Sequence, residues 1–161
     1  MANEHDGAIL ARLFAVQEDP ASLVEFLERE AWSIRDPSAY WLAVVSAWVK
    51  SGRAEYQDRY RKLLSVPRRN RIRGMKKASR RAYYALPREV VAYRAIAPGE
   101  DPDRALSWSL DCACIARLYP ARAIIARRFA KRDIAFYTDR RGERELIVLD
   151  ASLGQPLREG G

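Results

Sequence analysis

The chain has 161 residues, 48% of them hydrophobic, and a formal net charge of +8 at pH 7. This length and apolar content allow a substantial hydrophobic core and exclude a wholly disordered chain. The most apolar stretch, residues 39–49, is too short to span a bilayer, and the first residues lack the basic and apolar regions of a secretion signal, so we expect a cytoplasmic protein.

Residues 1–66 have the pattern of a small helical lobe. Apolar side chains recur at helical spacing over residues 8–17, and two Asp-Pro pairs, Asp19-Pro20 and Asp36-Pro37, each combine a helix cap with proline at the first helical position. Residues 38–50 are apolar almost all round, which predicts a buried third helix at the centre of the lobe.

A strongly basic segment follows the lobe. Residues 53–82 hold twelve basic and two acidic side chains, whereas the residues before and after them are nearly balanced in charge. We assign residues 67–86 to a basic linker or helix, with Ile72 and Met75 on one face, and expect an acidic partner for it. The segment is either a solvated cationic helix or a surface for nucleic-acid phosphates or an acidic protein. The polyanion-binding residues would be Arg68, Arg69, Arg71, Arg73, Lys76, Lys77, Arg80 and Arg81.

After Pro87 the pattern changes from helix to strand. A helix is expected near residues 111–119, residues 87–150 would form the core, and residues 151–161 are assigned to a tail. A helical lobe followed by a mostly antiparallel, strand-rich half is α+β organisation. The predicted strands lie at about 90–96, 106–110, 122–129, 133–137 and 144–149.

The two cysteines, Cys112 and Cys114, do not form a recognisable metal site. A structural zinc site needs four Cys or His ligands, and the one histidine, His5, lies far upstream. We therefore expect two buried thiols in a reduced protein, and no metal.

Three short motifs in the strand-rich half carry the chemistry. They are Arg94 in the first strand, Ser107-Trp108-Ser109 in the second, and Glu143-Arg144-Glu145 at the head of the last. Alternation along a strand would place the two carboxylates on one face, where they need a cationic partner or a reaction that uses them. In this order, over roughly the C-terminal half, the motifs resemble the arginine–serine–glutamate branch of the ADP-ribosyltransferase superfamily, whose compact members are often bacterial or phage-borne.

The resemblance implies a two-sheet, mostly antiparallel core with NAD in its cleft, and transfer of one ADP-ribose from NAD to a macromolecular acceptor. The charge of the basic segment favours an acidic acceptor. The acceptor would be a protein side chain, such as arginine, or a nucleic acid. A carboxylate beside the ribose stabilises its oxocarbenium character, and an arginine fork matches phosphate oxygens. The loop that faces the substrate would contain Tyr137, Thr138, Asp139, Arg140, Arg141 and Gly142.

The same resemblance gives roles to single residues. Glu145 would be the catalytic carboxylate, Glu143 would activate the acceptor, and Arg94 would anchor NAD and support the site. Ser107 would position the catalytic carboxylate, with Ser109 supporting the strand; both serines and Ala95 would contribute to cofactor binding. The chain departs from the family pattern at Ala95, where relatives often have glycine, and at Trp108, where many have threonine.

Two alternatives to the enzyme stay open. One is a nucleic-acid-binding protein in which residues 59–81 do the work, and the other is a catalytically inactive interaction module, which Ala95 favours. For Arg94 and Glu145, the alternative to a catalytic role is an ordinary ion pair between strands. Trp108 alternates away from the two serines, so we expect it in the hydrophobic core.

Overall fold

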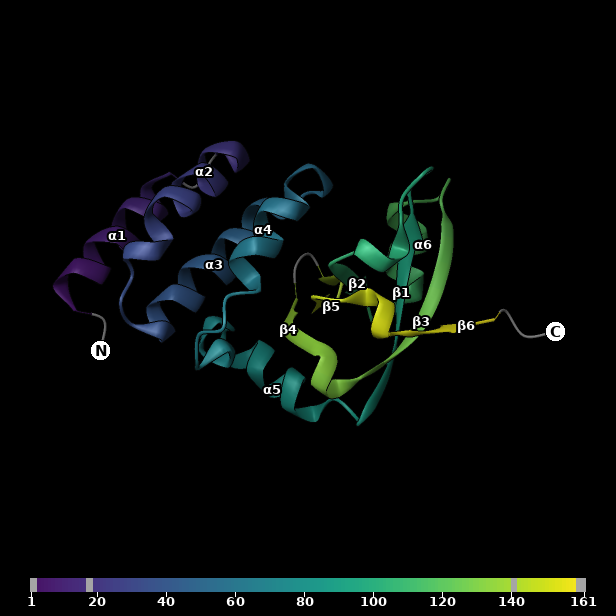
Figure 1. Ribbon diagram of the computed structural model, residues 1–161. Helices are drawn as coiled ribbons and strands as arrows, with labels where there is room; N and C mark the ends of the chain where they lie inside the picture. The colour runs from purple at the N-terminus through teal and green to yellow at the C-terminus, as the bar shows by residue number, and fades with distance from the viewer. Residues whose placement is uncertain (1–2, 17–18, 140–141, 159–161) are drawn as a thin grey trace. The chain divides into compact units, whose positions relative to one another are not determined.

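The computed structural model describes residues 3–16, 19–139 and 142–158. The chain divides into two compact units, Met1–Lys76 and Lys77–Gly161 (Figure 1). Each unit has its own buried apolar residues. The boundary between the units lies inside the basic segment 67–86. No helix in the described parts of the chain is both long and apolar enough to cross a membrane.

The first unit is helical and is organised around α3. Asp19 and Asp36 cap α2 and α3 by accepting backbone N–H hydrogen bonds, with proline at the start of each helix, so both predicted caps are confirmed. Helix α3 is largely buried and packs against α1, α2, α4 and η3. The helices are α1 (Glu4–Ala15), α2 (Pro20–Glu30), α3 (Pro37–Ser51) and α4 (Gln57–Leu64), with short 3-10 turns η1 (Ala31–Ser33), η2 (Ala54–Tyr56) and η3 (Arg71–Gly74).

Buried polar contacts fix the start of α3. Both carboxylate oxygens of Asp6 accept backbone hydrogen bonds, from Arg35 at 3.0 Å and from Asp36 at 2.9 Å. Burial of the Asp6 carboxyl group raises its pKa, but these hydrogen bonds outweigh that effect, so its pKa lies below the ordinary value of 3.8. The Tyr40 hydroxyl donates to the carbonyl of Leu63 at 2.8 Å, and burial raises the pKa of Tyr40 to about 12.

The second unit begins with α5 (Lys77–Ala85) and continues into one six-stranded antiparallel sheet, with α6 (Cys112–Leu118) between the second and third strands. The strand order is β4-β5-β2-β1-β3-β6. The α+β organisation is confirmed, and the five predicted strands form close to their expected positions. The strands are β1 (Glu89–Ile96), β2 (Ser107–Ser109), β3 (Ala123–Ala130), β4 (Ile134–Thr138), β5 (Glu145–Val148) and β6 (Gln155–Leu157).

The expectation of two packed sheets was wrong for the described residues. Strand β2 is three residues long, yet it pairs with β1 on one side and with β5 on the other. It therefore joins the β1–β3 and β4–β5 pairs into one continuous sheet. Residues 155–157, which the sequence placed in a tail, form β6 and pair with β3.

An aromatic pair links β2 and β3 on one face of this sheet. Trp108 is buried, as expected, and its ring lies 5.1 Å from that of Phe129 in an edge-to-face arrangement. Gly154 lies so close to Phe129 that an added Cβ would approach the ring to 2.3 Å. The absence of a side chain at Gly154 thus allows β6 to follow directly after the 3-10 turn η7 (Ala151–Leu153).

Candidate active site

A row of polar side chains crosses four neighbouring strands at one end of the sheet. Glu145, the first residue of β5, is the Cα partner of Ser109 on β2 and of Thr138 on β4. Ser109 is in turn the partner of Tyr93 on β1. Because residues directly opposite each other in antiparallel strands project to the same face, all four side chains lie on one face of the sheet.

The carboxylate of Glu145 is held by hydroxyl groups from both flanking strands. The Ser107 hydroxyl donates to Oε2, and the Thr138 hydroxyl donates to Oε1 at 2.9 Å. Glu145 is only 3% exposed, and a buried carboxylate is costly unless it accepts hydrogen bonds. Hydrogen bonds to a charged group are also the stronger kind. The two hydroxyls therefore fix the direction in which this carboxylate faces.

Arg94 contacts the backbone of Ser107 rather than the Glu145 carboxylate. Its Nη1 donates to the Ser107 carbonyl at 2.7 Å, and its Nε donates to Glu100 Oε1 at 2.6 Å. The second oxygen of Glu100 accepts the backbone N–H of Ala97 at 3.0 Å. Arg94 thus fastens the turn after β1 to the start of β2, where Ser107 holds the glutamate. Arg94 forms an ion pair with Glu100, so the direct ion pair between Arg94 and Glu145 that the sequence left open is not the arrangement found.

Glu143 is placed differently from the sequence expectation. Strand β5 starts only at Glu145, and Arg144 has a positive φ of 48°, which is uncommon for a residue other than glycine. Strand alternation does not extend through such a residue, so it does not place Glu143 and Glu145 on one face. The backbone of this turn is held at β2, because the carbonyl of Glu143 accepts from the Ser109 hydroxyl.

The residues predicted to form a substrate-facing loop divide into three groups. Tyr137 and Thr138 are buried residues of β4, and Thr138 holds Glu145. Asp139 and Gly142 are exposed. Arg140 and Arg141 lie outside the described residues. Thr138 was predicted to face the substrate, and in the structure its hydroxyl donates to the Glu145 carboxylate.

Sequence reasoning missed Tyr93, Glu100 and the contact of Thr138. Glu100 lies in a turn that the sequence indicates, but nothing local distinguishes it from the acidic residues beside it. A β-branched hydroxyl residue such as Thr138, at the end of a strand that precedes an acidic motif, is a signal that would have suggested the contact. Ala95, predicted to contribute to cofactor binding, is buried in β1.

The predicted polyanion-binding residues belong to both units. Arg68, Arg69, Arg71, Arg73 and Lys76 lie in the first unit, and Lys77, Arg80 and Arg81 lie in the second. A single basic helix does not form: residues 71–74 are a 3-10 turn, and α5 starts at Lys77. The reason is that Gly74 and Met75 are buried rather than continuing along a solvated helix.

Among the described residues, the two cysteines do not form a metal site, and the comparisons with known proteins identify no family for this chain. Cys114 is buried, but Cys112 is exposed, so the expectation of two buried thiols was wrong for Cys112. Within the described ranges, no three His, Cys, Asp or Glu side chains gather in a way that suits a metal ion. Comparisons with protein-family models, curated proteins and solved structures find no match to this chain.

Proposed function

We propose that this protein is a mono-ADP-ribosyltransferase that uses Glu145 as its catalytic carboxylate and NAD as the donor. The observation that supports the proposal most is the clamp on Glu145, in which hydroxyls from β2 and β4 each hold one carboxylate oxygen. A buried carboxylate with a fixed direction is the arrangement that electrostatic catalysis requires.

The proposed chemistry uses the chain's own residues in simple roles. NAD would supply the ADP-ribose and release nicotinamide with the electron pair of the broken glycosidic bond. Glu145 would stabilise the positive charge that develops on the ribose, as carboxylates do in glycoside cleavage. Glu143, two residues earlier and half-buried, would accept the proton of the incoming acceptor nucleophile.

One other residue of the site suits a dinucleotide, and a second supports the site. Tyr93 is half-buried and lies in the same cross-strand row as Glu145, so it offers a ring for contact with a flat heterocycle. Arg94 supports the site by holding Ser107 in place. Its guanidinium also contacts Glu100, and because Arg94 follows Tyr93 in β1, its side chain projects to the other face of the sheet.

The experiment that tests the proposal measures transfer of labelled ADP-ribose from NAD to macromolecules of a bacterial lysate, with mass spectrometry of the labelled products. Glu145→Gln keeps the volume and removes the charge, and loss of one such group typically slows the reaction about a hundred- to a thousand-fold. Glu89→Gln, the same change at an exposed position of β1, is the matched control and should leave the rate unchanged. A Glu145→Gln rate within tenfold of wild type would exclude Glu145 from the catalytic role.

A second candidate is an inactive member of the same kind of fold, kept for binding. The Arg94–Glu100 contact favours it, because an arginine that is already paired is less available to a phosphate. Calorimetric titration with NAD separates the two candidates. Binding of NAD without release of nicotinamide, whichever acceptor is added, would favour the inactive module. NAD turnover that depends on Glu145 would favour the enzyme.

A further inference from the structure

The densest cationic surface of the first unit is the segment of residues 68–76, here called the cationic turn. It contains four arginines and one lysine, and the sequence has no acidic residue anywhere between residues 59 and 88. Such a surface attracts polyanions, but charge alone does not distinguish a built site from a solvated segment. The contacts of the turn make that distinction.

The backbone of the cationic turn is fixed on α3. The Trp41 indole N–H donates to the carbonyl of Arg69 at 2.9 Å. Gly74 lies so close to the same helix that an added Cβ would approach the Trp41 carbonyl oxygen to 2.6 Å. Asn70 adopts a left-handed conformation with φ of 59°, which turns the chain sharply between these two contacts. The turn is therefore rigidly held before any partner binds.

The arginines of the turn fall into two classes. Arg68 and Arg71 lie over aromatic rings of α3, with their guanidinium carbons 4.2 Å from the Tyr40 centroid and 5.3 Å from the Trp41 centroid. Arg68 also donates to the carbonyl of Ile34 at 2.6 Å. By contrast, the exposed side chains of Arg69 and Arg73 make no hydrogen bond or ion pair with any described residue. The first class holds the turn, and the second is available to a ligand.

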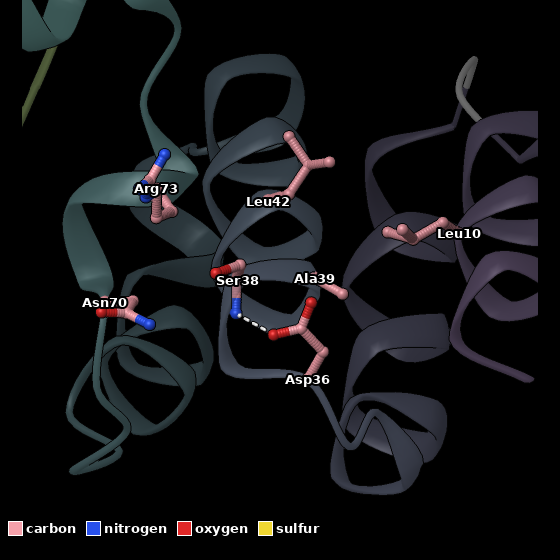
Figure 2. A pocket seen from close by; sticks show the side chains of 7 residues that line it. All are labelled: Leu10, Asp36, Ser38, Ala39, Leu42, Asn70 and Arg73. Atoms are coloured by element: carbon pink, nitrogen blue, oxygen red, sulfur yellow. Dashed lines mark hydrogen bonds between the residues drawn. The ribbon is translucent and has the colours of Figure 1, made fainter. Parts of the chain in front are cut away.

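A pocket of about 450 Å³ opens beside Arg73 (Figure 2). Figure 2 shows Arg73 and Asn70 on one side of the pocket and Leu10 on the other, with Asp36 and Ser38 near the start of α3. Ala39 and Leu42 complete the lining. The pocket thus combines apolar contacts, an acceptor carboxylate, amide and hydroxyl groups, and an adjacent guanidinium.

We propose that the cationic turn and this pocket bind single-stranded nucleic acid, with phosphates on Arg69 and Arg73 and one unstacked base in the pocket. A base supplies apolar faces for Leu42 and amino-group donors for Asp36, and its phosphate reaches Arg73. An acidic peptide fits less well, because its side chains offer neither a flat ring for the pocket nor an amino-group donor for Asp36. Duplex also fits less well, because its bases stay stacked and cannot enter a pocket. The inference does not rest on catalysis by Glu145, since binding is measured without NAD.

The test uses fluorescence anisotropy with a labelled, mixed-sequence DNA strand of about 12 nucleotides, within the site size of single-strand binders. The variant is Arg69→Gln with Arg73→Gln. Arg53→Gln with Lys62→Gln removes the same charge from exposed positions elsewhere in this unit and is the matched control. We expect at least a tenfold loss of affinity for the first variant only, with a melting temperature equal to wild type. For this variant, the slope of log affinity against log salt concentration should be less steep by about 1.4, because each of the two lost phosphate contacts contributes about 0.7.

Three further probes decide which ligand the site takes. Wild type should bind the strand more tightly than the same sequence as a duplex, and more tightly than a strand of abasic residues. If the single strand, the duplex and the abasic strand bind equally tightly, the proposal that a base enters the pocket is overturned. A polyglutamate peptide that binds as tightly as the strand, with the same loss in the Arg69/Arg73 variant, would overturn nucleic acid as the partner. Equal losses in the variant and its control would reduce the turn to general electrostatic attraction and would also refute the proposal.

Discussion

Removing either hydroxyl that holds Glu145 should destabilise the second unit. Thr138→Val is the cleaner change, because a methyl group replaces the hydroxyl with little change in shape. Glu145 is 3% exposed, so water cannot easily replace the lost donor. A hydrogen bond to a charged group contributes about 1.5–3 kcal/mol to stability. For a unit of this size, 1 kcal/mol corresponds to about 4–8 °C in melting temperature, so Thr138→Val should lower the transition by roughly 10 °C.

The assay is scanning calorimetry, with hydrogen exchange to assign the affected transition to residues 77–161. Ser107→Ala removes the donor to the other carboxylate oxygen, and the double variant should depart from additivity because both hydroxyls act on one group. Ser152→Ala removes an exposed hydroxyl that donates to Asp150, and should change stability by less than about 0.5 kcal/mol. If Thr138→Val lowers the stability of the second unit by no more than Ser152→Ala does, the Thr138 hydroxyl does not stabilise the Glu145 carboxylate as argued.

Four further results are expected. Asp6→Asn should lower stability by about 1.5–3 kcal/mol at neutral pH, and the wild-type advantage should disappear in urea titrations as pH falls through the lowered Asp6 pKa, below 3.8. The raised pKa of Tyr40 contributes stability fully below about pH 10, and this is lost as pH rises toward about 12; Tyr40→Phe should flatten that alkaline decline. Gly154→Ala should cost about 1–3 kcal/mol in thermal unfolding, because its Cβ would collide with the Phe129 ring. Arg94→Lys should lower both the melting temperature and kcat, whereas a residue that only anchors NAD would change KM alone.

Local patterns in the sequence predicted most of the elements. The Asp-Pro pairs start α2 and α3 because a carboxylate caps the free N–H groups while proline is already set at a helical φ. The β-branched runs predicted five strands for a similar reason, since such side chains suit a pleated and half-buried surface. These signals depend only on residues that are close in the sequence, so one sequence is enough to predict the helices and strands that they mark.

Features that depend on distant pairing were not predicted. The segment with β6 reads as a tail because Gly154, Gln155 and Pro156 have weak strand preference on their own. It pairs with β3 because Gly154 allows close approach to the Phe129 ring. The single sheet likewise depends on β2, whose three residues carry little local signal and pair on both sides.

The candidate site shows the same division between local and distant information. The contact of Ser107 with Glu145 was expected from the family resemblance, but the contacts of Thr138 with Glu145 and of Arg94 with Glu100 were not. With 29 basic and 21 acidic side chains in the chain, residue types alone cannot select Glu100 as the partner of Arg94. The hydroxyl clamp arises because β5 lies between β2 and β4, so that Ser107 and Thr138 approach one carboxylate from opposite sides. Strand order therefore decides which residues could act with Glu145, and strand order is set by the whole sheet rather than by any one motif.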